Sequence, residues 1–505
     1  MFLLSAMSHE LSTKIMYPDL KEFISLTKKG NLIPVYDEIL ADLETPVSAF
    51  LKIENKEFSY LLESVEGEEK VARFSFLGSE PSIIFSSKGK YISITTNKYT
   101  KRFVTEKDPL NELKKLMSVY KFVPVKGLPR FCGGMVGFIG YDMVRFFEKL
   151  PSKNSDDLNI PDSIFMFTDT ILIFDHANHK IKIVSNVYVP DSLKNNKNKI
   201  AYLYSMAVKR INLLKNEIEK PLVKNHAILA VKKPIMKSNF SKKEFCRVVR
   251  KAKDYIHRGD IIQVVLSQRF KIKALRPSFD IYRNLRSINP SPYMFYLKMG
   301  KIILMGSSPE LLVRCEDGAL ETRPIAGTRP RGANEEEDKV LREDLLKDNK
   351  ERAEHVMLVD LGRNDIGRVS SSKSVKVKNF MNIEKYSHVM HIVSEVVGKL
   401  KKDKTIFDAL VSCFPAGTVS GAPKVRAMEI IEELENSRRS VYAGSVGYFS
   451  FSGNLDTCIT IRSVLVKDGF AYVQAGAGIV ADSVPEKEYV ETINKAKAQL
   501  KAITG

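Results

Sequence analysis

Cysteine is scarce in this 505-residue chain, and tryptophan is absent. The five cysteines lie far apart and show no metal-ligand spacing, which argues against a zinc site. They are Cys132, Cys246, Cys315, Cys413 and Cys458. Because an odd number of thiols cannot all pair, we expect reduced cysteines and a cytoplasmic location.

Long apolar runs are missing as well. No stretch is long enough to cross a bilayer, so we expect no membrane partner. Residues 1–8 include a short apolar run but no basic leader, and we therefore expect no secretory signal. Met1 and Met7 remain alternative starts.

Acidic residues are outnumbered, because 79 lysines and arginines face 60 aspartates and glutamates, giving a formal net charge of +19. This excess suits an acidic small molecule, nucleic acid or an anionic surface, but it is also typical of a lysine-rich solvated face. The lysines form short groups and no long basic tract. We find no nucleic-acid module and no basic residues interleaved with aromatics, so we favour the solvated face and expect no nucleic-acid partner.

The first half of the chain has the texture of short strands. With 44% apolar residues, the chain can form one large domain or two to three smaller ones. Residues 164–174 and 181–188 are β-rich runs around a hairpin signal at 175–179. Residues 190–240 are rich in lysine and asparagine, include an amphipathic run at about 200–218, and are typical of a connection.

The second half begins with a clear helix signal. Ser241 and Glu244 form a capping-box pattern, and Gly259 marks the end of the helix. Residues 261–270 then predict a buried strand, in which Gln263 and Gln268 need partners or a ligand. These signals indicate a mixed fold of strands with packed helices.

Nucleotide-binding signatures are not found. A regular alternation of strand and helix is missing, which disfavours a doubly wound sheet. Gly133, Gly134, Gly137 and Gly140 form neither the dinucleotide fingerprint nor a P-loop. We interpret them as sites of close backbone packing.

Two predicted helices repeat an acidic spacing. Glu351 and Glu354 begin one helix, Glu488 and Glu491 begin the other, and Pro485 fits a first helical turn. Residues three apart share a helix face. Either pair alone is more often a complement to the helix dipole. Together the two pairs could bind a hard cation, and oxygen-only ligands favour Mg²⁺ over Zn²⁺.

Several segments could bind an anion. Residues 323–332 contain three arginines, two glycines and two prolines, which predicts a rigid cationic loop. Residues 415–424 form a glycine turn before a helix, and residues 476–478 end a strand with exposed backbone. Arg462 interrupts an apolar strand, where its partner is either a ligand or a buried carboxylate of the protein.

Two acid–base candidates stand apart from these segments. His391 lies in an apolar run, where a hydrogen-bonded core histidine is more common than a catalyst. Glu310 lies between a turn and an apolar run, as a helix cap or as a general acid. The combined prediction is a basic, glycine-lined pocket for Mg²⁺ and a small polycarboxylate.

In these motifs the chain resembles the chorismate-utilising enzymes, and among them the large subunits of anthranilate synthases. The second half carries, in order, GSSPELLVR at 306–314, RPIAGTRPRG at 323–332, KERAEHVMLVDLGRND at 350–365, VMHIVS at 389–394 and PAGTVSGAPK at 415–424. The first half adds residues 61–66, 133–138 and 141–142. The resemblance is dense over about residues 240–500.

The resemblance implies an α+β fold with two lobes, whose antiparallel sheets pack orthogonally as a β-sandwich surrounded by helices. It implies a regulatory lobe at 1–215, a connecting segment at 216–239 and a catalytic domain at 240–505. The implied reaction is the amination of chorismate by ammonia, followed by loss of pyruvate to give anthranilate. Mg²⁺ is the implied cofactor.

The resemblance also implies a role for each matched residue. The implied metal ligands are Glu354 and Glu491, supported by Glu351 and Glu488. The implied substrate-binding residues are Gly327, Thr328, Tyr442, Arg462, Gly476, Ala477, Gly478 and Lys495. The implied catalytic residues are Glu310 as the general acid, His391 in the eliminations, and Thr418 near the substrate.

Two positions separate the related reactions. Relatives that make aminodeoxychorismate commonly have a nucleophilic lysine at the position of Ala326, and relatives that make isochorismate have a lysine base at the position of Gln263. Neither residue here can do that work, so ammonia remains the expected nucleophile. Aminodeoxychorismate synthase is the alternative function.

A partner and a regulator follow from the same resemblance. None of the five cysteines lies in a glycine-rich nucleophile elbow, so ammonia is expected from a separate glutamine amidotransferase subunit (component II). The implied site for the inhibitor L-tryptophan comprises Ser64, Pro292, Tyr293 and Met294. The alternative for residues 289–295 is a proline-rigid turn before a strand.

Overall fold

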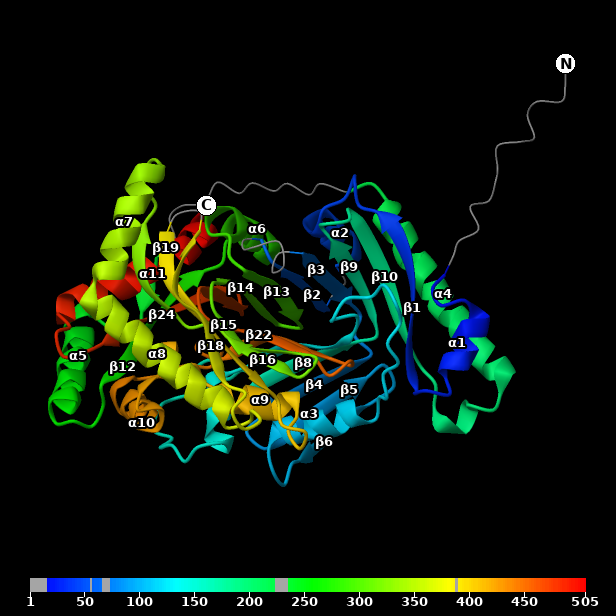
Figure 1. Cartoon of the computed structure of the whole chain (residues 1–505), viewed down its shortest axis with the longest axis horizontal. Helices are drawn as coiled ribbons and strands as arrows, with labels where there is room; N and C mark the ends of the chain where they lie inside the picture. Colours follow the sequence, from blue (N-terminus) through cyan, green and yellow to red (C-terminus); the bar gives the residue numbers. More distant parts are fainter. Residues whose placement is uncertain (1–15, 55–56, 66–72, 223–234, 387–388) are drawn as a thin grey trace, which may run out of the picture.

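Two antiparallel sheets of twelve strands each form the centre of the molecule, and helices surround them (Figure 1). The computed structural model describes residues 16–54, 57–65, 73–222, 235–386 and 389–505. The predicted α+β fold class, with two antiparallel sheets and helices, is confirmed.

The first sheet joins strands from both halves of the chain. Its order is β1 (Leu32–Leu40), β10 (Lys180–Tyr188), β9 (Thr170–Asp175), β3 (Phe74–Ser79), β2 (Phe58–Glu63), β13 (Tyr293–Met299), β14 (Ile302–Ser308), β23 (Ser463–Lys467), β24 (Phe470–Ile479), β12 (Gln263–Lys273) and β11 (Lys237–Ser238), with β20 (Gly421–Ala422) beside β12.

The second sheet is built in the same way. Its order is β17 (Ile325–Pro330), β19 (Val389–Lys399), β16 (Ala319–Thr322), β15 (Leu311–Glu316), β22 (Leu455–Ile459), β21 (Ser445–Ser450), β7 (Gly134–Ile139), β8 (Ser163–Thr168), β4 (Ile83–Lys88), β5 (Tyr91–Thr96) and β6 (Thr100–Val104), with β18 (Lys376–Lys385) beside β19.

Helices cover the outer faces and ends of the sheets (Figure 1). They are α1 (Leu20–Leu26), α2 (Pro46–Ile53), α3 (Pro109–Ser118), α4 (Lys197–Glu219), α5 (Lys242–His257), α6 (Ser278–Ile288), α7 (Glu335–Lys347), α8 (Asn349–Gly367), α9 (Ile406–Cys413), α10 (Lys424–Leu434) and α11 (Pro485–Thr504). A short 3₁₀ turn, η3 (Gly417–Val419), precedes α10.

A hydrophobic core between the two sheets holds them together. Tyr60 and Phe76 from the first sheet share one cluster with Val136 and Met166 from the second, and all four are buried. Fully burying one such large apolar side chain contributes roughly 1.5–3 kcal/mol. The sheets therefore form one packed body around which the sites are arranged.

The two halves of the chain meet inside the sheets. β2 pairs with β13, placing Glu63 opposite Met294, and β7 pairs with β21 in the second sheet. The boundaries at 1–215, 216–239 and 240–505 stay a prediction, and residues 223–234 lie outside the described part of the chain.

Local sequence signals are confirmed where they predict single elements. α5 has the expected capping box between Ser241 and Glu244, and Gly259 follows it with φ +79°. α4 and the β9–β10 hairpin also lie where predicted. The run at 164–174, however, is two strands in different sheets, because the chain crosses between sheets at Asp169.

The glycines of β7 allow close strand contact. A Cβ added to Gly137 would lie 1.9 Å from the carbonyl oxygen of Ile164, so no other residue fits there. This geometry confirms the interpretation of these glycines as packing sites.

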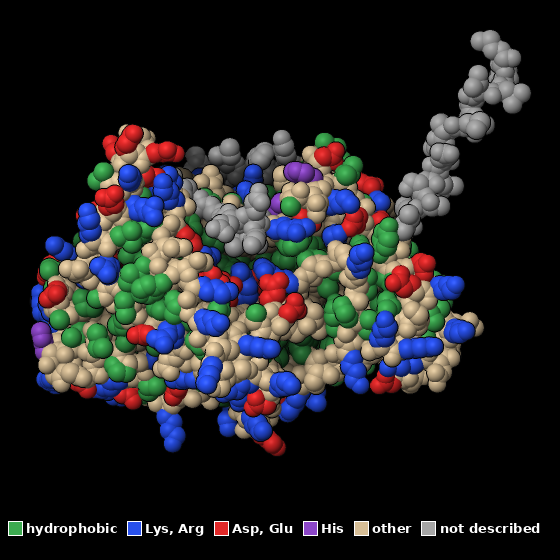
Figure 2. Space-filling view, viewed as in Figure 1, with side chains coloured by type: hydrophobic (Ala, Val, Ile, Leu, Met, Phe, Trp, Pro, Cys, Tyr) green, Lys and Arg blue, Asp and Glu red, His purple; other side chains and the backbone are tan. Residues whose placement is uncertain are grey.

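All five cysteines are free and buried. Within the described residues, no helix has both the length and the apolarity needed to cross a bilayer. Figure 2 shows Lys and Arg side chains scattered over the face in view, as expected for a solvated basic surface.

Candidate active site

A cavity of about 580 Å³ lies among β12, β17, β19, β24, α8, α11 and η3. This volume is within the roughly 300–1,000 Å³ of small-molecule sites. The predicted site residues that line it are Glu310, Gly327, Thr328, Glu351, Glu354, His391, Thr418, Tyr442, Arg462, Gly476, Gly478, Glu488, Glu491 and Lys495. We call it the main cavity.

Ala477 is the one predicted substrate-binding residue that does not line the main cavity. Its side chain lies in the hydrophobic cluster beneath β12 and β24, with Val249 and Ile430. Residues 476–478 pair with β12 along one edge of β24, while the pairing of β24 with β23 ends at Val473, so their other backbone edge is not covered by β23.

Two helix starts direct the four glutamates into the main cavity. Asp348 caps α8 by accepting hydrogen bonds from the amides of Lys350 and Glu351, and α11 begins at Pro485. Burial and the neighbouring Glu354 carboxylate raise the pKa of Glu351. These repelling carboxylates gather where a cation could stabilise them.

The donor set fits Mg²⁺ in its chemistry. All four side chains offer oxygen only, which this ion prefers. Among the described residues, no group of three or more His, Cys, Asp or Glu side chains is already arranged around a metal position. Mg²⁺ usually keeps waters and uses only one or two carboxylates plus substrate oxygens, so a preformed cage is not required.

Nearby polar groups restrain two of these glutamates. Gln263 donates to Glu354 over 3.3 Å, and Lys495 pairs with Glu491 at 2.6 Å. Lys495 also donates to the carbonyl of Gly476 over 3.1 Å. Glutamine at position 263 therefore serves as a hydrogen-bond donor beside the acidic group.

The arginine-rich segment 323–332 is not a free cationic loop, and that expectation is wrong. Residues 325–330 form strand β17 beside β19. Arg323 pairs with Glu384, Arg329 with Asp344 and Asp348, and Arg331 with Asp338. Because α7, α8 and β18 supply these carboxylates, the three arginines face away from the main cavity.

Residues 325–328 are the part of this segment that lines the main cavity. Ala326 is 8% exposed, and it pairs with Ile392 of β19. Gly327 has φ +65°, and a Cβ there would lie 2.9 Å from Leu345 and 3.3 Å from a Glu351 oxygen. The small residues keep this wall clear and the backbone close to Glu351.

Arg462 is the guanidinium that does line the main cavity. It lies in the turn between β22 and β23 with φ +52°, rather than within a strand as expected. Its Nη1 donates to the carbonyl of Lys495 over 2.6 Å, and no carboxylate of the described residues lies within ion-pair distance. The alternative of an internal salt bridge is therefore not found, and the charge can meet an anionic ligand.

Glu310 lies between β14 and β15 at the bottom of the main cavity and is 9% exposed. Burial raises the pKa of its carboxyl group to about 7, opposed by Thr418 and Lys495. Thr418 Oγ1 lies near this carboxyl but has no hydrogen bond of normal geometry within the described residues. A carboxyl that is protonated near neutral pH can act as a general acid.

His391 extends from β19 toward the turn at Gly327. Its Nδ1 lies 2.8 Å from the carbonyl oxygen of Gly327 and 3.1 Å from the hydroxyl of Thr328. Burial lowers the pKa of the imidazole. Donation from Nδ1 to Gly327 leaves Nε2 as an acceptor, which is the form that a base needs.

A buried pair that the sequence did not reveal supports the floor of the main cavity. Arg439 binds Glu435 at 2.6 Å, and it donates to the carbonyls of Val419 and Val265, each over 2.6 Å. Its guanidinium also lies over the ring of Tyr442, 5.5 Å from the centroid. Glu435 is only four positions before Arg439, but the two carbonyl partners come from η3 and β12, which no local pattern in the sequence reveals.

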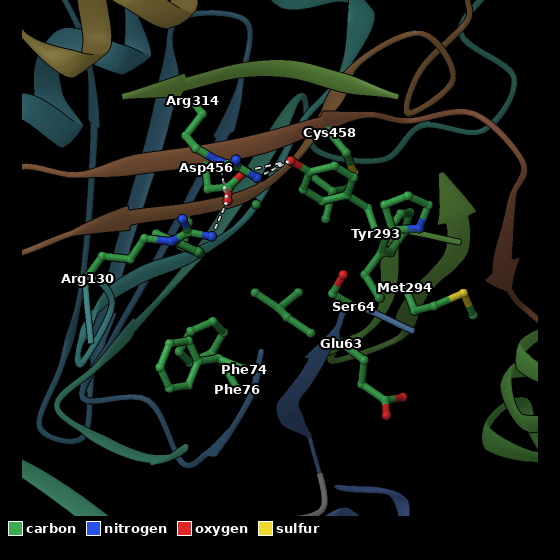
Figure 3. Close-up of a pocket in the computed structure, with 16 residues that line it drawn as sticks. Glu63, Ser64, Phe74, Phe76, Arg130, Tyr293, Met294, Arg314, Asp456 and Cys458 are labelled. Atoms are coloured by element: carbon green, nitrogen blue, oxygen red, sulfur yellow. Dashed lines mark hydrogen bonds and ion pairs between the residues drawn. The ribbon is translucent and has the colours of Figure 1, made fainter. Parts of the chain in front are cut away.

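A second cavity brings together the residues predicted for tryptophan (Figure 3). Its lining includes Ser64, Pro292, Tyr293, Met294, Glu63, Phe74, Phe76, Arg130, Arg314, Asp456 and Cys458. We call it the regulatory-candidate cavity. Arg130 and Glu63 lie on different sides of it, and the Glu63 carboxylate points away from Arg130, Phe74 and Phe76 (Figure 3).

The polar groups of this second cavity are ordered, with one exception. Tyr293 donates to Asp456 over 3.0 Å, and Arg314 and Arg130 pair with Asp456 at 3.0 Å and 3.2 Å. The buried Ser64 Oγ has no hydrogen-bond partner among the residues that the structure describes. An orphaned hydroxyl beside aromatic walls suits a ligand that is apolar and carries polar groups.

Comparisons with known proteins identify the family of the chain. Residues 58–501 match the chorismate binding enzyme family. Anthranilate synthase component 1 from Acetivibrio thermocellus is 52% identical over 97% of this chain and 99% of that protein, and the one from Aquifex aeolicus is 51% identical over 96% and 97%. The crystal structure of anthranilate synthase component I from Streptococcus pneumoniae TIGR4 has a TM-score of 0.75 and 39% identity, covering 92% of this chain and 99% of that one.

A more distant structure shares the fold alone. The menaquinone-specific isochorismate synthase from Escherichia coli has a TM-score of 0.69 with 19% identity, covering 96% of this chain and 99% of that one.

Proposed function

Because the chain belongs to the chorismate binding enzyme family, with close relatives named anthranilate synthase component 1, we propose that it converts chorismate to anthranilate as the large subunit of that enzyme. One observation carries the proposal. A single cavity joins an acidic group for a cation, the unpaired Arg462 and the protonatable Glu310, with alanine rather than lysine at position 326.

The proposed reaction needs an acid and charge neutralisation. Ammonia forms a bond to ring carbon 2, the carbon–oxygen bond at position 4 breaks, and Glu310 gives its proton to the departing hydroxyl, which leaves as water. Loss of the proton from carbon 2 and of the enolpyruvyl group as pyruvate then produces the aromatic ring. Such acid catalysis typically contributes about 10²–10⁴-fold.

Mg²⁺, held by Glu354 and Glu491 with Glu351 and Glu488 in support, would neutralise the ring carboxylate of chorismate. Arg462 binds the enolpyruvyl carboxylate in this proposal, because its charge has no carboxylate partner among the described residues. His391, with Nε2 as an acceptor, is placed to take part in the elimination.

The remaining lining residues position the substrate. Gly327, Thr328, Tyr442, Gly476, Gly478 and Lys495 supply backbone, hydroxyl and ammonium groups around the ring. Gln263 and Ala326 cannot replace ammonia as nucleophile or activate water, which favours amination over the isochorismate reaction.

Ammonia comes, in this proposal, from a separate glutamine amidotransferase subunit. The relatives' designation as component 1 supports a second component. We also propose a cytoplasmic location, since all five cysteines are free.

The regulatory-candidate cavity is proposed to bind L-tryptophan as a feedback inhibitor. Phe74, Phe76 and Met294 offer apolar contacts to an indole ring, and the orphaned Ser64 hydroxyl is available to the polar end, while the Glu63 carboxylate is held by Tyr282 and Arg286. The cavity joins β2, β13 and β22, so a ligand there contacts both sheets.

The activity can be tested with the purified chain alone. Incubation with chorismate, Mg²⁺ and a high concentration of ammonium should give anthranilate fluorescence, which chelation of Mg²⁺ abolishes. Glu354→Gln should lose the Mg²⁺-dependent activity while remaining folded. Accumulation of an aminated, non-aromatic product would instead indicate aminodeoxychorismate synthase.

A further inference from the structure

A smaller cavity lies directly beside the main cavity, and the two share Glu310, Leu358 and Thr418 as a common wall. We call it the side cavity. Its outer lining includes the half-buried Leu361 and Gly362, and its inner lining reaches the buried Glu310. The side cavity therefore extends from these half-buried residues of α8 to the proposed general acid.

One face of α8 runs past both cavities in sequence. Glu354 lines the main cavity, Leu358 lines both, and Leu361 and Asp365 line the side cavity. Glu354 and Asp365 are eleven positions apart, which is close to three helical turns and places them on the same face. The same helix thus presents Glu351 and Glu354 to the main cavity and Asp365 to the side cavity.

Two polar atoms that line the side cavity lack partners. Asp365 is 6% exposed, and its Oδ1 has no hydrogen-bond partner among the described residues, while Lys424 binds Oδ2 at 2.8 Å. Thr418 Oγ1, on the shared wall, is likewise buried without a hydrogen bond of normal geometry among the described residues, although it lies near the Glu310 carboxyl. A buried carboxylate oxygen is rarely left unsatisfied, so both atoms indicate a small polar occupant.

The size of the side cavity limits that occupant to water. Its volume is about 40 Å³. One water needs at least roughly 10–15 Å³ on the same measure, so about three waters fit. Asp365, Thr418 and Glu310 supply the polar partners that buried waters require.

We propose that the side cavity holds a short water chain between Asp365 and Glu310, through which Glu310 regains a proton in each turnover. The inference rests on the proposed function, in which Glu310 transfers its proton to the departing hydroxyl. A solvent proton passes to Asp365, along the waters beside Thr418, and to the Glu310 carboxylate. The attacking nitrogen releases one proton to solvent, which balances the proton that Glu310 takes up.

Charged groups around Asp365 suit this role. Burial raises the pKa of Asp365, while Lys424 and the more distant Arg368 oppose that shift. Lys424 binds one carboxylate oxygen, and the other has no hydrogen-bond partner among the described residues, so it is available to a water. Asp365 is a positioning and proton-holding residue here, since it does not line the main cavity.

Asp365→Asn tests the water chain in the full chain with ammonium as the nitrogen source. We expect kcat to fall about tenfold or more, with KM for chorismate and for ammonium unchanged and a larger solvent deuterium isotope effect on kcat. Asp360→Asn is the matched control, because Asp360 is on the same helix, exposed and paired with Arg363. The control should keep the wild-type kcat and isotope effect.

A second variant separates a proton path from a loss of structure. Thr418→Val removes the orphaned hydroxyl, and combining it with Asp365→Asn should lower kcat no further than Thr418→Val alone if both act on one path. Multiplicative losses would overturn the proposal. So would an unchanged kcat in Asp365→Asn, or a raised KM for ammonium with normal kcat, which would indicate an ammonia passage.

Failure of the water chain is distinguishable from failure of the proposed function. If the wild-type chain forms no anthranilate, the proposed function is wrong, and the water chain, which rests on it, is wrong as well. If the wild type and Asp365→Asn form anthranilate at equal rates and Glu310→Gln does not, the function stands and only the water chain is wrong.

Discussion

Glu310 and the four glutamates of α8 and α11 are one residue type in different surroundings. Burial raises the pKa of Glu310 to about 7, so its acid form is lost as the pH rises through 7. We expect kcat/KM to fall above about pH 7 for that reason. A pH–rate profile checks this, and residual activity of Glu310→Gln should lack the falling limb. A falling limb that persists unchanged would assign it to another group.

The proposed contact between Arg462 and a substrate carboxylate can be tested by the loss of kcat/KM when the guanidinium is removed. Arg462→Ala removes a charge-assisted contact to a substrate carboxylate, which should cost about 2–4 kcal/mol of transition-state binding if the pair is desolvated. Measuring kcat/KM for chorismate gives this value directly. Arg286→Ala is a suitable control, because Arg286 pairs with Glu63 far from the main cavity. An unaffected kcat/KM in Arg462→Ala would make Arg462 structural.

Residue chemistry was predictable from the sequence where the partner is nearby, but not where it is distant. The capping of α8 by Asp348 and the placement of Glu351 and Glu354 on one helix face follow from local spacing. The three arginines of residues 323–332 were misread because their carboxylates come from α7, α8 and β18. Charge in a sequence does not show which charges the fold neutralises.

At the scale of elements, the pair Arg439–Glu435 ties η3, β12 and the end of α10 together. Removing one partner leaves a buried charge, so Arg439→Met should destabilise the protein by about 3–5 kcal/mol. Arg439→Met combined with Glu435→Leu should recover much of that loss, because both charges are then gone. Urea unfolding measures both values. A double variant as unstable as the sum of the two single variants would mean that the pair does not act as a unit.

At the scale of the whole molecule, both sheets run through both halves of the chain. Helices were predictable from local signals, whereas this continuity depends on pairs such as β2 with β13 and β7 with β21, which are far apart in sequence. We therefore expect one cooperative thermal transition rather than two. Calorimetry with equal van't Hoff and calorimetric enthalpies would agree. Two separated transitions would support independent lobes at the predicted boundaries.

β22 links the regulatory-candidate cavity to the backbone of Glu310. Asp456 and Cys458 of β22 line the regulatory-candidate cavity, and the next residue, Ile459, donates its amide to the carbonyl of Glu310 over 3.0 Å. A ligand that shifts β22 would therefore move the backbone at Glu310. Coupling of this kind must act in both directions with the same factor.

Tryptophan and chorismate should therefore weaken each other's binding equally. We expect tryptophan to lower chorismate affinity by about 5- to 150-fold, the usual range of such coupling, and chorismate to lower tryptophan affinity by the same factor. Titration calorimetry with each ligand in the presence of the other measures both factors. Ser64→Arg, which fills the regulatory-candidate cavity, should abolish the effect and keep catalysis, because Ser64 is remote from the main cavity. Unequal factors, or inhibition that survives in Ser64→Arg, would place tryptophan elsewhere.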